Sequence, residues 1–311
     1  MALIAGFVVA VVATPLAARL AARLGLIDRP GPLKVHSKPV PYLGGLAVLA
    51  ALLAPLAGVR PSLLVPLGLA CALGFADDAT DLPPAVRLAV EVGIGVAAAW
   101  VAAPHDAVHV ALGVLAVLVL VNAVNLLDGL DGLAAAVVGL GAIGSFVVLS
   151  GASATFALAL AGGLGGFLVW NAPPARVYLG DAGSYLIGTA LAMLFLAAAQ
   201  RHAAVVSGAL LFAGVPVADT AVAIVRRMRA GTPLLRGDRG HVYDQLVDRG
   251  WSSKVAVLAC VAVQGALTGA GIGIASLSGG VAVAVAVATV AVVGAGAIFA
   301  FTSPRAWTPD H

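Results

Sequence analysis

Long apolar runs separated by short polar connections fill almost the whole chain. Eleven runs approach or exceed the ~17 residues of the shortest helix that crosses a bilayer. They lie at roughly 2–20, 44–60, 62–76, 86–103, 107–124, 132–149, 153–170, 183–199, 203–224, 254–274 and 279–302. Open strands are excluded because their unpaired backbone groups would face hydrocarbon. The pattern predicts an all-α, polytopic integral membrane bundle of about 11 transmembrane helices, with 10 as the alternative.

Composition leads to the same class of protein. Hydrophobic residues make up 61% of the chain and charged residues only 10%, whereas soluble domains carry about 25% charged residues. Disordered, collagen-like and disulfide-stapled proteins are excluded. Cys71 and Cys260 lie inside apolar runs, where we expect small packing residues. Because no basic residue precedes the first run, we expect a retained span there rather than a signal peptide.

Charged residues predict the orientation of the bundle. All but two of the 17 Lys and Arg residues fall on one side of the predicted spans, the exceptions being Arg60 and Arg201. The positive-inside rule then places the N-terminus outside and the C-terminus in the cytoplasm. We expect a multi-pass plasma-membrane protein with one catalytic domain over 1–302, its active site on the cytoplasmic face, and a cytoplasmic tail at 303–311. The loops that form this site are predicted at 21–43, 77–85, 125–131, 171–182 and 225–253.

Three carboxylates follow the third run, in Asp77-Asp78-Ala79-Thr80-Asp81. Adjacent carboxylates repel one another and therefore need a cation or abundant water. Mg²⁺ prefers a few carboxylates together with phosphate oxygens. The string indicates a site for Mg²⁺ or Mg²⁺-diphosphate, and a solvated acidic turn is the structural alternative.

Polar residues recur every three positions at the end of the fifth run: Asn122, Asn125, Asp128 and Asp131. This spacing places them on a slowly rotating stripe of one helical end. Polar groups in an apolar helix are costly and are usually functional. The stripe is typical of a nucleotide-sugar pocket, although helix-capping beside a loop would also use such residues.

Two further segments carry candidate chemistry. Asp181, in Gly180-Asp181-Ala182-Gly183-Ser184, is either a helix cap or a metal ligand whose neighbouring backbone N–H groups face a phosphate. The basic connection 226–254 includes Arg239 and His241 and can bind a diphosphate or anionic lipid, although some of its charge serves orientation. His36 lies in the basic segment Lys34-Val35-His36-Ser37-Lys38.

Together and in this order, these strings resemble the polyprenyl-phosphate N-acetylhexosamine-1-phosphate transferase family, which includes the phospho-N-acetylmuramoyl-pentapeptide transferases. The resemblance spans essentially the whole chain. It also includes Lys34-x-His36 with Pro41-x-x-Gly44-Gly45, and Pro216-x-x-Asp219-Thr220. Relatives usually carry His-x-His-His where this chain reads His241-Val242-Tyr243-Asp244, so only His241 carries over.

The resemblance implies an enzyme that transfers a sugar-1-phosphate from a UDP-sugar donor to a polyprenyl phosphate acceptor, releasing UMP. The lipid-diphosphate sugar would start a cell-envelope glycan. The branch implied is that of UDP-N-acetylglucosamine, with another UDP-N-acetylhexosamine or a muramoyl-pentapeptide donor as alternatives. Mg²⁺, or Mn²⁺ in its place, is the implied cofactor.

The resemblance also implies roles for individual residues. Asp181 is the expected metal ligand, shared with Asp77 or Asp78, and these three are the expected catalytic residues. The substrate-binding residues implied are Lys34, His36, Asn122, Asn125, Asp128, Asp131, Arg239 and His241.

Other classes of protein remain as alternatives. An ion-coupled secondary transporter would also use membrane carboxylates, but transporter sites usually lie near the bilayer midplane. A CDP-alcohol phosphotransferase would need an Ala-Arg pair after its Asp-Gly, which residues 128–136 lack. The expected partners are the lipid bilayer and the two substrates. No nucleic-acid partner is expected, and a homodimer is left open.

Overall fold

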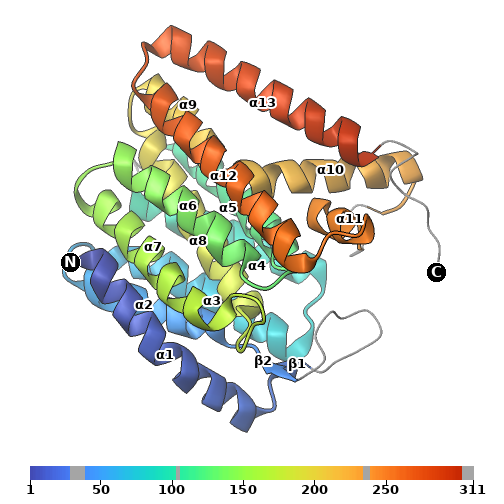
Figure 1. Ribbon diagram of the computed structural model, residues 1–311. Coiled ribbons are helices and arrows are strands. Elements are labelled where there is room, and N and C mark those ends of the chain that lie inside the picture. Colours follow the sequence, from blue (N-terminus) through green and yellow to red (C-terminus); the bar gives the residue numbers. More distant parts are fainter. Residues whose placement is uncertain (29–38, 103–105, 234–238, 303–311) are drawn as a thin grey trace.

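The described residues, 1–28, 39–102, 106–233 and 239–302, are almost entirely helical in the computed structural model (Figure 1). The first half contains α1 (Ala2–Leu24), β1 (Ile27–Asp28), β2 (Val40–Pro41), α2 (Gly44–Ala57), η1 (Pro61–Leu63), α3 (Leu64–Thr80), α4 (Pro84–Ala102) and α5 (Ala107–Leu127). The second half contains α6 (Leu133–Val148), α7 (Gly151–Asn171), α8 (Gly180–Ala199), α9 (Ala203–Ala209), η2 (Leu210–Ala213), α10 (Gly214–Ala230), α11 (Val242–Asp248), α12 (Ser253–Ala275) and α13 (Gly279–Thr302).

Every predicted apolar run coincides with helical structure. Within the described residues, nine helical segments are long and apolar enough to cross a membrane. The apolar helices α2 and α6 are shorter, with 14 and 16 residues. The protein is therefore a multi-pass, nearly all-α membrane protein, and the short helix α11 is an element that the apolar pattern did not predict.

The predicted run 203–224 is not one regular helix, because η2 interrupts it between α9 and α10. Pro216 follows the interruption and has no backbone N–H to continue the helical hydrogen bonds. The buried side chain of Gln264, on α12, satisfies the backbone groups that this break leaves. Its Nε2 donates to Leu211 O (3.1 Å) and Phe212 O (3.3 Å), and its Oε1 accepts from Val215 N (3.0 Å).

The helix α8 lies at the centre of the bundle and packs against α2, α3, α5 and α6. Of its most apolar 18-residue window, 83% is buried, against 22% for α1 and 11% for α13. Close approach to α3 requires glycine, since a Cβ on Gly74 would lie 2.1 Å from Asp181 O. The position of the first turn of α8 is therefore set by its neighbours on several sides.

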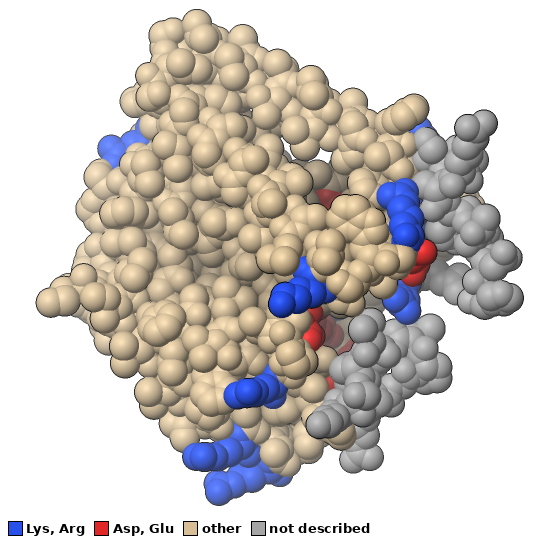
Figure 2. Space-filling view, in the orientation of Figure 1, with Lys and Arg blue, Asp and Glu red and all other residues tan. Residues whose placement is uncertain are grey.

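A small strand pair ties the first connection to the α7–α8 connection. The strands β1 and β2 are antiparallel, and Tyr42 next to β2 forms a bridge with Tyr178. Gly44 N donates to Tyr178 O (3.0 Å) and Gly45 N to Leu179 O (3.0 Å). On the face seen in Figure 2, basic side chains surround a hollow in which acidic side chains are visible.

Candidate active site

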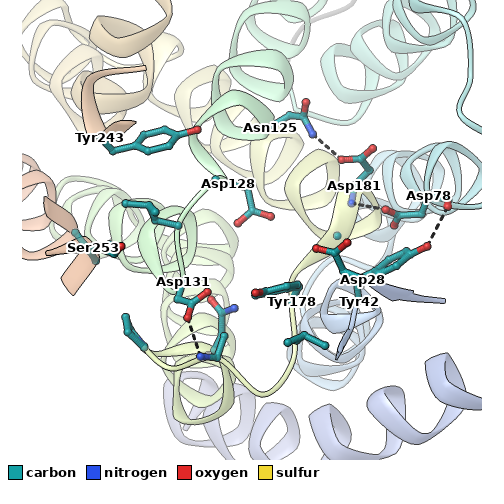
Figure 3. A pocket seen from close by; sticks show the side chains of 18 of the residues that line it. Asp28, Tyr42, Asp78, Asn125, Asp128, Asp131, Tyr178, Asp181, Tyr243 and Ser253 are labelled. Carbon is teal, nitrogen blue, oxygen red and sulfur yellow. Dashed lines mark hydrogen bonds between the residues drawn. The ribbon is translucent and has the colours of Figure 1, made fainter. Parts of the chain in front are cut away.

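A cavity of about 1550 Å³ opens at the end of the bundle where α3 and α5 end and α8 begins. Its lining comes from segments that are far apart in the sequence (Figure 3). Eight carboxylates line it: Asp28, Asp77, Asp78, Asp81, Asp128, Asp131, Asp181 and Asp244. We call the side formed by Asp77, Asp78, Asp128 and Asp181 the acidic wall. The four carboxylates on which the sequence hypothesis depends thus share one hollow.

Asp181 lies in the first turn of α8 and is held by α5. Its Oδ1 accepts a hydrogen bond from Asn125 Nδ2 at 2.7 Å. The same amide nitrogen donates to Ser184 Oγ at 3.1 Å. This arrangement keeps one carboxylate oxygen of Asp181 engaged and turns the residue to the cavity (Figure 3).

Asp78 caps the N-terminus of α8 from the end of α3. Its Oδ1 accepts from Asp181 N and its Oδ2 from Ala182 N, both at 3.0 Å. Leu179, the N-cap residue of α8 itself, makes no side-chain hydrogen bond to the end of the helix. The interpretation of Asp181 as the helix cap is therefore wrong, because Asp181 lies within the first turn and the capping carboxylate is Asp78. The two N–H groups that the other interpretation directs to a phosphate have Asp78 as their acceptor.

Asp77 is engaged through both of its carboxylate oxygens. Oδ1 accepts from Leu82 N (2.8 Å), and Oδ2 accepts from Arg87 Nη1 (2.9 Å) and Tyr185 Oη (2.5 Å). Its side chain is only 2% exposed. Asp77 therefore joins α3 to α4 and to α8.

Asp128 and Asp131 lie in the turn after α5. Asp131 Oδ2 accepts from Ala175 N at 2.8 Å, which fastens this turn to the α7–α8 connection. Burial raises the pKa of the Asp128 carboxyl well above its ordinary value, and the charges of Asp181 and Asp78 raise it further. The negative charge of the neighbouring carboxylates thus disfavours ionisation of Asp128.

The opposite side of the cavity comes from the connection between α10 and α12 and from the first turn of α12. We call Arg239, Tyr243 and Lys254 on this side the basic wall. Tyr243 Oη donates to Leu126 O at 2.9 Å. A Cβ on Gly129 would lie 2.2 Å from that hydroxyl, so the turn needs glycine there. Arg239 Nη2 lies 3.9 Å from Asp244 Oδ1.

Two predicted substrate residues do not line the cavity. Asn122 Nδ2 donates to Glu91 Oε2 (2.7 Å) within the bundle, because the stripe has rotated away from the cavity there. His241 is buried, with Nδ1 2.6 Å from Asp219 Oδ2. Lys34 and His36 lie outside the described residues.

The donor atoms of the acidic wall fit Mg²⁺. Within the part of the chain that the structure describes, no group of three or more His, Cys, Asp or Glu side chains could hold a metal ion by itself. Mg²⁺ usually takes one or two protein carboxylates and completes its shell with water and substrate phosphates. Asp181 and Asp78 supply hard oxygen donors of that kind. They fit a cation that arrives together with a phosphate ligand.

Several residues of the site were not predicted from the sequence. Tyr42, Tyr178 and Asn171 line the cavity, and Arg87 and Tyr185 hold Asp77. The sequence signal that could have identified Tyr185 is its spacing of four residues from Asp181, which puts both side chains on one face of α8. Arg87 entered the sequence-based prediction only as one of the basic residues on the predicted cytoplasmic side.

Comparisons with known proteins agree on one family. Residues 61–199 match the family described as glycosyl transferase family 4. A Bacillus subtilis protein named "Probable undecaprenyl-phosphate N-acetylglucosaminyl 1-phosphate transferase" is 30% identical over 83% of this chain and 80% of its own length. Decaprenyl-phosphate N-acetylglucosaminephosphotransferase of Mycolicibacterium smegmatis is 31% identical over 77% and 73%. Phospho-N-acetylmuramoyl-pentapeptide-transferase of Cutibacterium acnes is 32% identical, but over only 39% and 33%.

Proposed function

Because the chain belongs to glycosyl transferase family 4, we propose that it transfers N-acetylglucosamine 1-phosphate from UDP-N-acetylglucosamine to a polyprenyl phosphate. The observation that carries this proposal is the cavity at the end of an apolar bundle that brings together Asp78, Asn125, Asp128 and Asp181. A charged donor and a lipid acceptor can meet at such a place. Two relatives matched over most of their length are named for transfer of N-acetylglucosamine phosphate, which favours this donor over a muramoyl-pentapeptide one.

The proposed reaction is one displacement at phosphorus. An oxygen of the lipid phosphate forms a bond to the β-phosphorus of the donor, and the bond from that phosphorus to the bridging oxygen breaks. UMP leaves with the bridging oxygen. The lipid phosphate has a second pKa near ~6 and is largely ionised at neutral pH, so no strong general base is needed.

The main barrier is the repulsion between two anions, and positioning and charge neutralisation lower it. A bound Mg²⁺ would neutralise phosphate charge between the reactants, with Asp181 as its main protein ligand and Asp78 beside it. Asn125 orients the Asp181 carboxylate. Arg239 and Lys254 bring positive charge to the opposite side, where we place the donor diphosphate. The turn with Asp128 and Asp131 would contact the uridine or the sugar.

An apolar cavity of about 280 Å³ offers a place for part of the acceptor's hydrocarbon chain. It lies where the interruption η2 meets α5 and α8, and Leu120, Phe195 and Phe212 are among its lining residues. Its walls are almost free of polar groups. We assign this cavity to the lipid and the acidic one to the phosphates, and we place the acidic end on the cytoplasmic side.

The test is a donor panel with purified protein, Mg²⁺ and a polyprenyl phosphate. UMP release and the mass of the lipid product are measured, and UDP-N-acetylglucosamine is expected to give both. The Asp181→Asn variant, folded to the same extent, is the control. UMP release that does not require the lipid phosphate, or a lipid product with another sugar, would contradict the proposal. Lipid-independent solute uptake by proteoliposomes would favour a transporter instead.

A further inference from the structure

Adjacent carboxylates Asp77 and Asp78 have different surroundings, although the sequence presents them as equivalent. Both residues line the cavity, but within the described part of the chain the two oxygens of Asp78 accept only backbone N–H groups of α8. Both oxygens of Asp77 accept from Leu82, Arg87 and Tyr185 instead. Three donors share its two oxygens, and one of them is a guanidinium. Asp77 thus has a dedicated positive partner within the protein.

The partners of Asp77 belong to two other helices. Arg87 is in the first turn of α4, and its Nη1 donates also to Tyr185 Oη at 3.1 Å. Tyr185 lies on α8 one helical turn after Asp181, so it reaches Asp77 from the same face that carries Asp181. The result is a closed triangle of Asp77, Arg87 and Tyr185 that ties together α3, α4 and α8.

A second polar pair, Glu91 and Asn122, connects α4 to α5. Glu91, one turn after Arg87 on α4, is buried and accepts from Asn122 Nδ2 at 2.7 Å. Asn122 is one turn before Asn125, the residue that donates to Asp181. Helices α4 and α5 are therefore joined by one pair, and both reach the first two turns of α8 through the other contacts. All of these contacts converge on the segment that carries Asp181.

We infer that Asp77, Arg87 and Tyr185 are positioning residues: they hold the first two turns of α8 so that Asp181 faces the phosphates, and Asp77 neither binds the metal nor takes a proton. The inference rests on the proposed function for its kinetic readout. A metal ligand or a base needs free lone pairs directed to the substrate. Asp77 already accepts from three donors, one of them a guanidinium, and its side chain is only 2% exposed, whereas Asp78 accepts from two backbone N–H groups and has no such cationic donor among the described residues.

The decisive experiment is a double-mutant cycle that compares Asp77→Asn, Arg87→Gln and the variant with both changes. Each single change leaves a charge without its partner, a buried one in Arg87→Gln and a partly exposed one in Asp77→Asn. The double change removes both charges and leaves two amides that can bond to each other. We expect each single variant to lower kcat about 10- to 100-fold, as loss of an outer partner of a metal ligand does. The double variant should recover most of that loss, with the Mg²⁺ concentration for half-maximal rate unchanged.

A double variant that regains the thermal stability of the wild type but keeps the kcat of Asp77→Asn would overturn the inference, because a base or ligand cannot be replaced by removing Arg87. Tyr185→Phe covers the case in which the cycle variants do not fold. It keeps both charges, and it should lower kcat while leaving the Mg²⁺ requirement unchanged. An increased Mg²⁺ requirement in Tyr185→Phe would instead make Asp77 a ligand.

Failure of the proposed function is distinguished by the wild type itself. If the wild type releases no UMP from any donor, the transfer reaction is wrong, and Mg²⁺-induced thermal stabilisation then decides the inference. Stabilisation of the double variant equal to that of the wild type supports a positioning role for Asp77. Loss of stabilisation in the double variant to the level of Asp181→Asn overturns it.

Discussion

The acidic and basic walls of the cavity are held in different ways. Three carboxylates of the acidic wall, Asp77, Asp78 and Asp181, bond to another helix or connection, as Asp78 does to the N-terminus of α8. In the basic wall, Tyr243 lies on the short helix α11, which is joined to the lightly packed α13. There Arg249 Nη2 donates to Ala300 O (3.0 Å) and Gln245 Nε2 to Phe301 O (3.1 Å). Under the proposed function, we expect the acidic wall to set the geometry of the reacting phosphates and the basic wall to adapt to the bound donor.

The largest effect is expected from Asp181→Asn. The substitution keeps the size of the side chain and removes the charge that would hold the cation. We expect kcat to fall by at least about 100-fold, the upper end of what loss of an outer partner costs. The measurement is UMP release over a range of Mg²⁺ concentrations. If the variant differs from the wild type only in the KM for the donor, Asp181 is not the metal ligand that we propose.

The next effect is expected from Gly180→Ala. Gly180 has a φ of +72°, and an added Cβ would lie 2.9 Å from Asp78 Oδ2. We expect displacement of Asp78 from the end of α8 and a fall in kcat of about tenfold or more, as for other outer partners. Gly25→Ala is a matched control, because Gly25 has a φ of +75° but no atoms within 4 Å of the added Cβ. Equal losses of turnover in both variants would show that backbone strain alone is responsible.

A smaller effect is expected when the basic wall is loosened by Arg249→Ala. Exposed charged contacts contribute at most about 1 kcal/mol, so the KM for the donor should rise by up to about fivefold. The kcat should hardly change. Arg60→Ala is the control, since Arg60 Nη2 likewise donates to a helix carbonyl, Val101 O, but does not line the cavity. A fall in kcat with unchanged KM would contradict the proposed division between the walls.

The smallest effect is a pH-dependent gain in stability in Asp128→Asn without Mg²⁺. Folding raises the pKa of Asp128, so the folded state binds its proton more tightly than the unfolded state does. Between the ordinary carboxyl pKa and the raised value, stability therefore falls as pH rises. The variant should unfold at a higher temperature than the wild type at pH 8, and the difference should shrink as pH falls through that interval.

Asp106→Asn is the counterpart with the opposite sign. The backbone N–H of His109 lowers the pKa of Asp106, and its charge therefore favours the folded state above that pKa. This variant should be less stable than the wild type at pH 8. Thermal unfolding of both variants across pH, with and without Mg²⁺, makes the comparison. A loss of stability at pH 8 in Asp128→Asn would contradict the unfavourable effect of the neighbouring carboxylates described for Asp128.

The apolar pattern predicted the helices well, because helix length in lipid follows from the span of hydrocarbon. It could not reveal the interruption at η2, since Gln264 repairs that break from a helix distant in sequence. The clustering of Asp77, Asp78, Asp128 and Asp181 followed from their places at the ends of apolar runs. The different surroundings of Asp77 and Asp78 could not be predicted in this way, because these surroundings depend on which helix lies opposite each residue.

The central position of α8 has a consequence for how the protein can change over generations. Helices at the periphery face lipid on one side and tolerate exchange among apolar residues there, whereas α8 is 83% buried over its apolar window and has a neighbour on every side. For an inhibitor that binds to the first turn of α8, we expect few substitutions to give resistance. Substitutions that dislodge such a compound would also disturb the packing of the helices around α8.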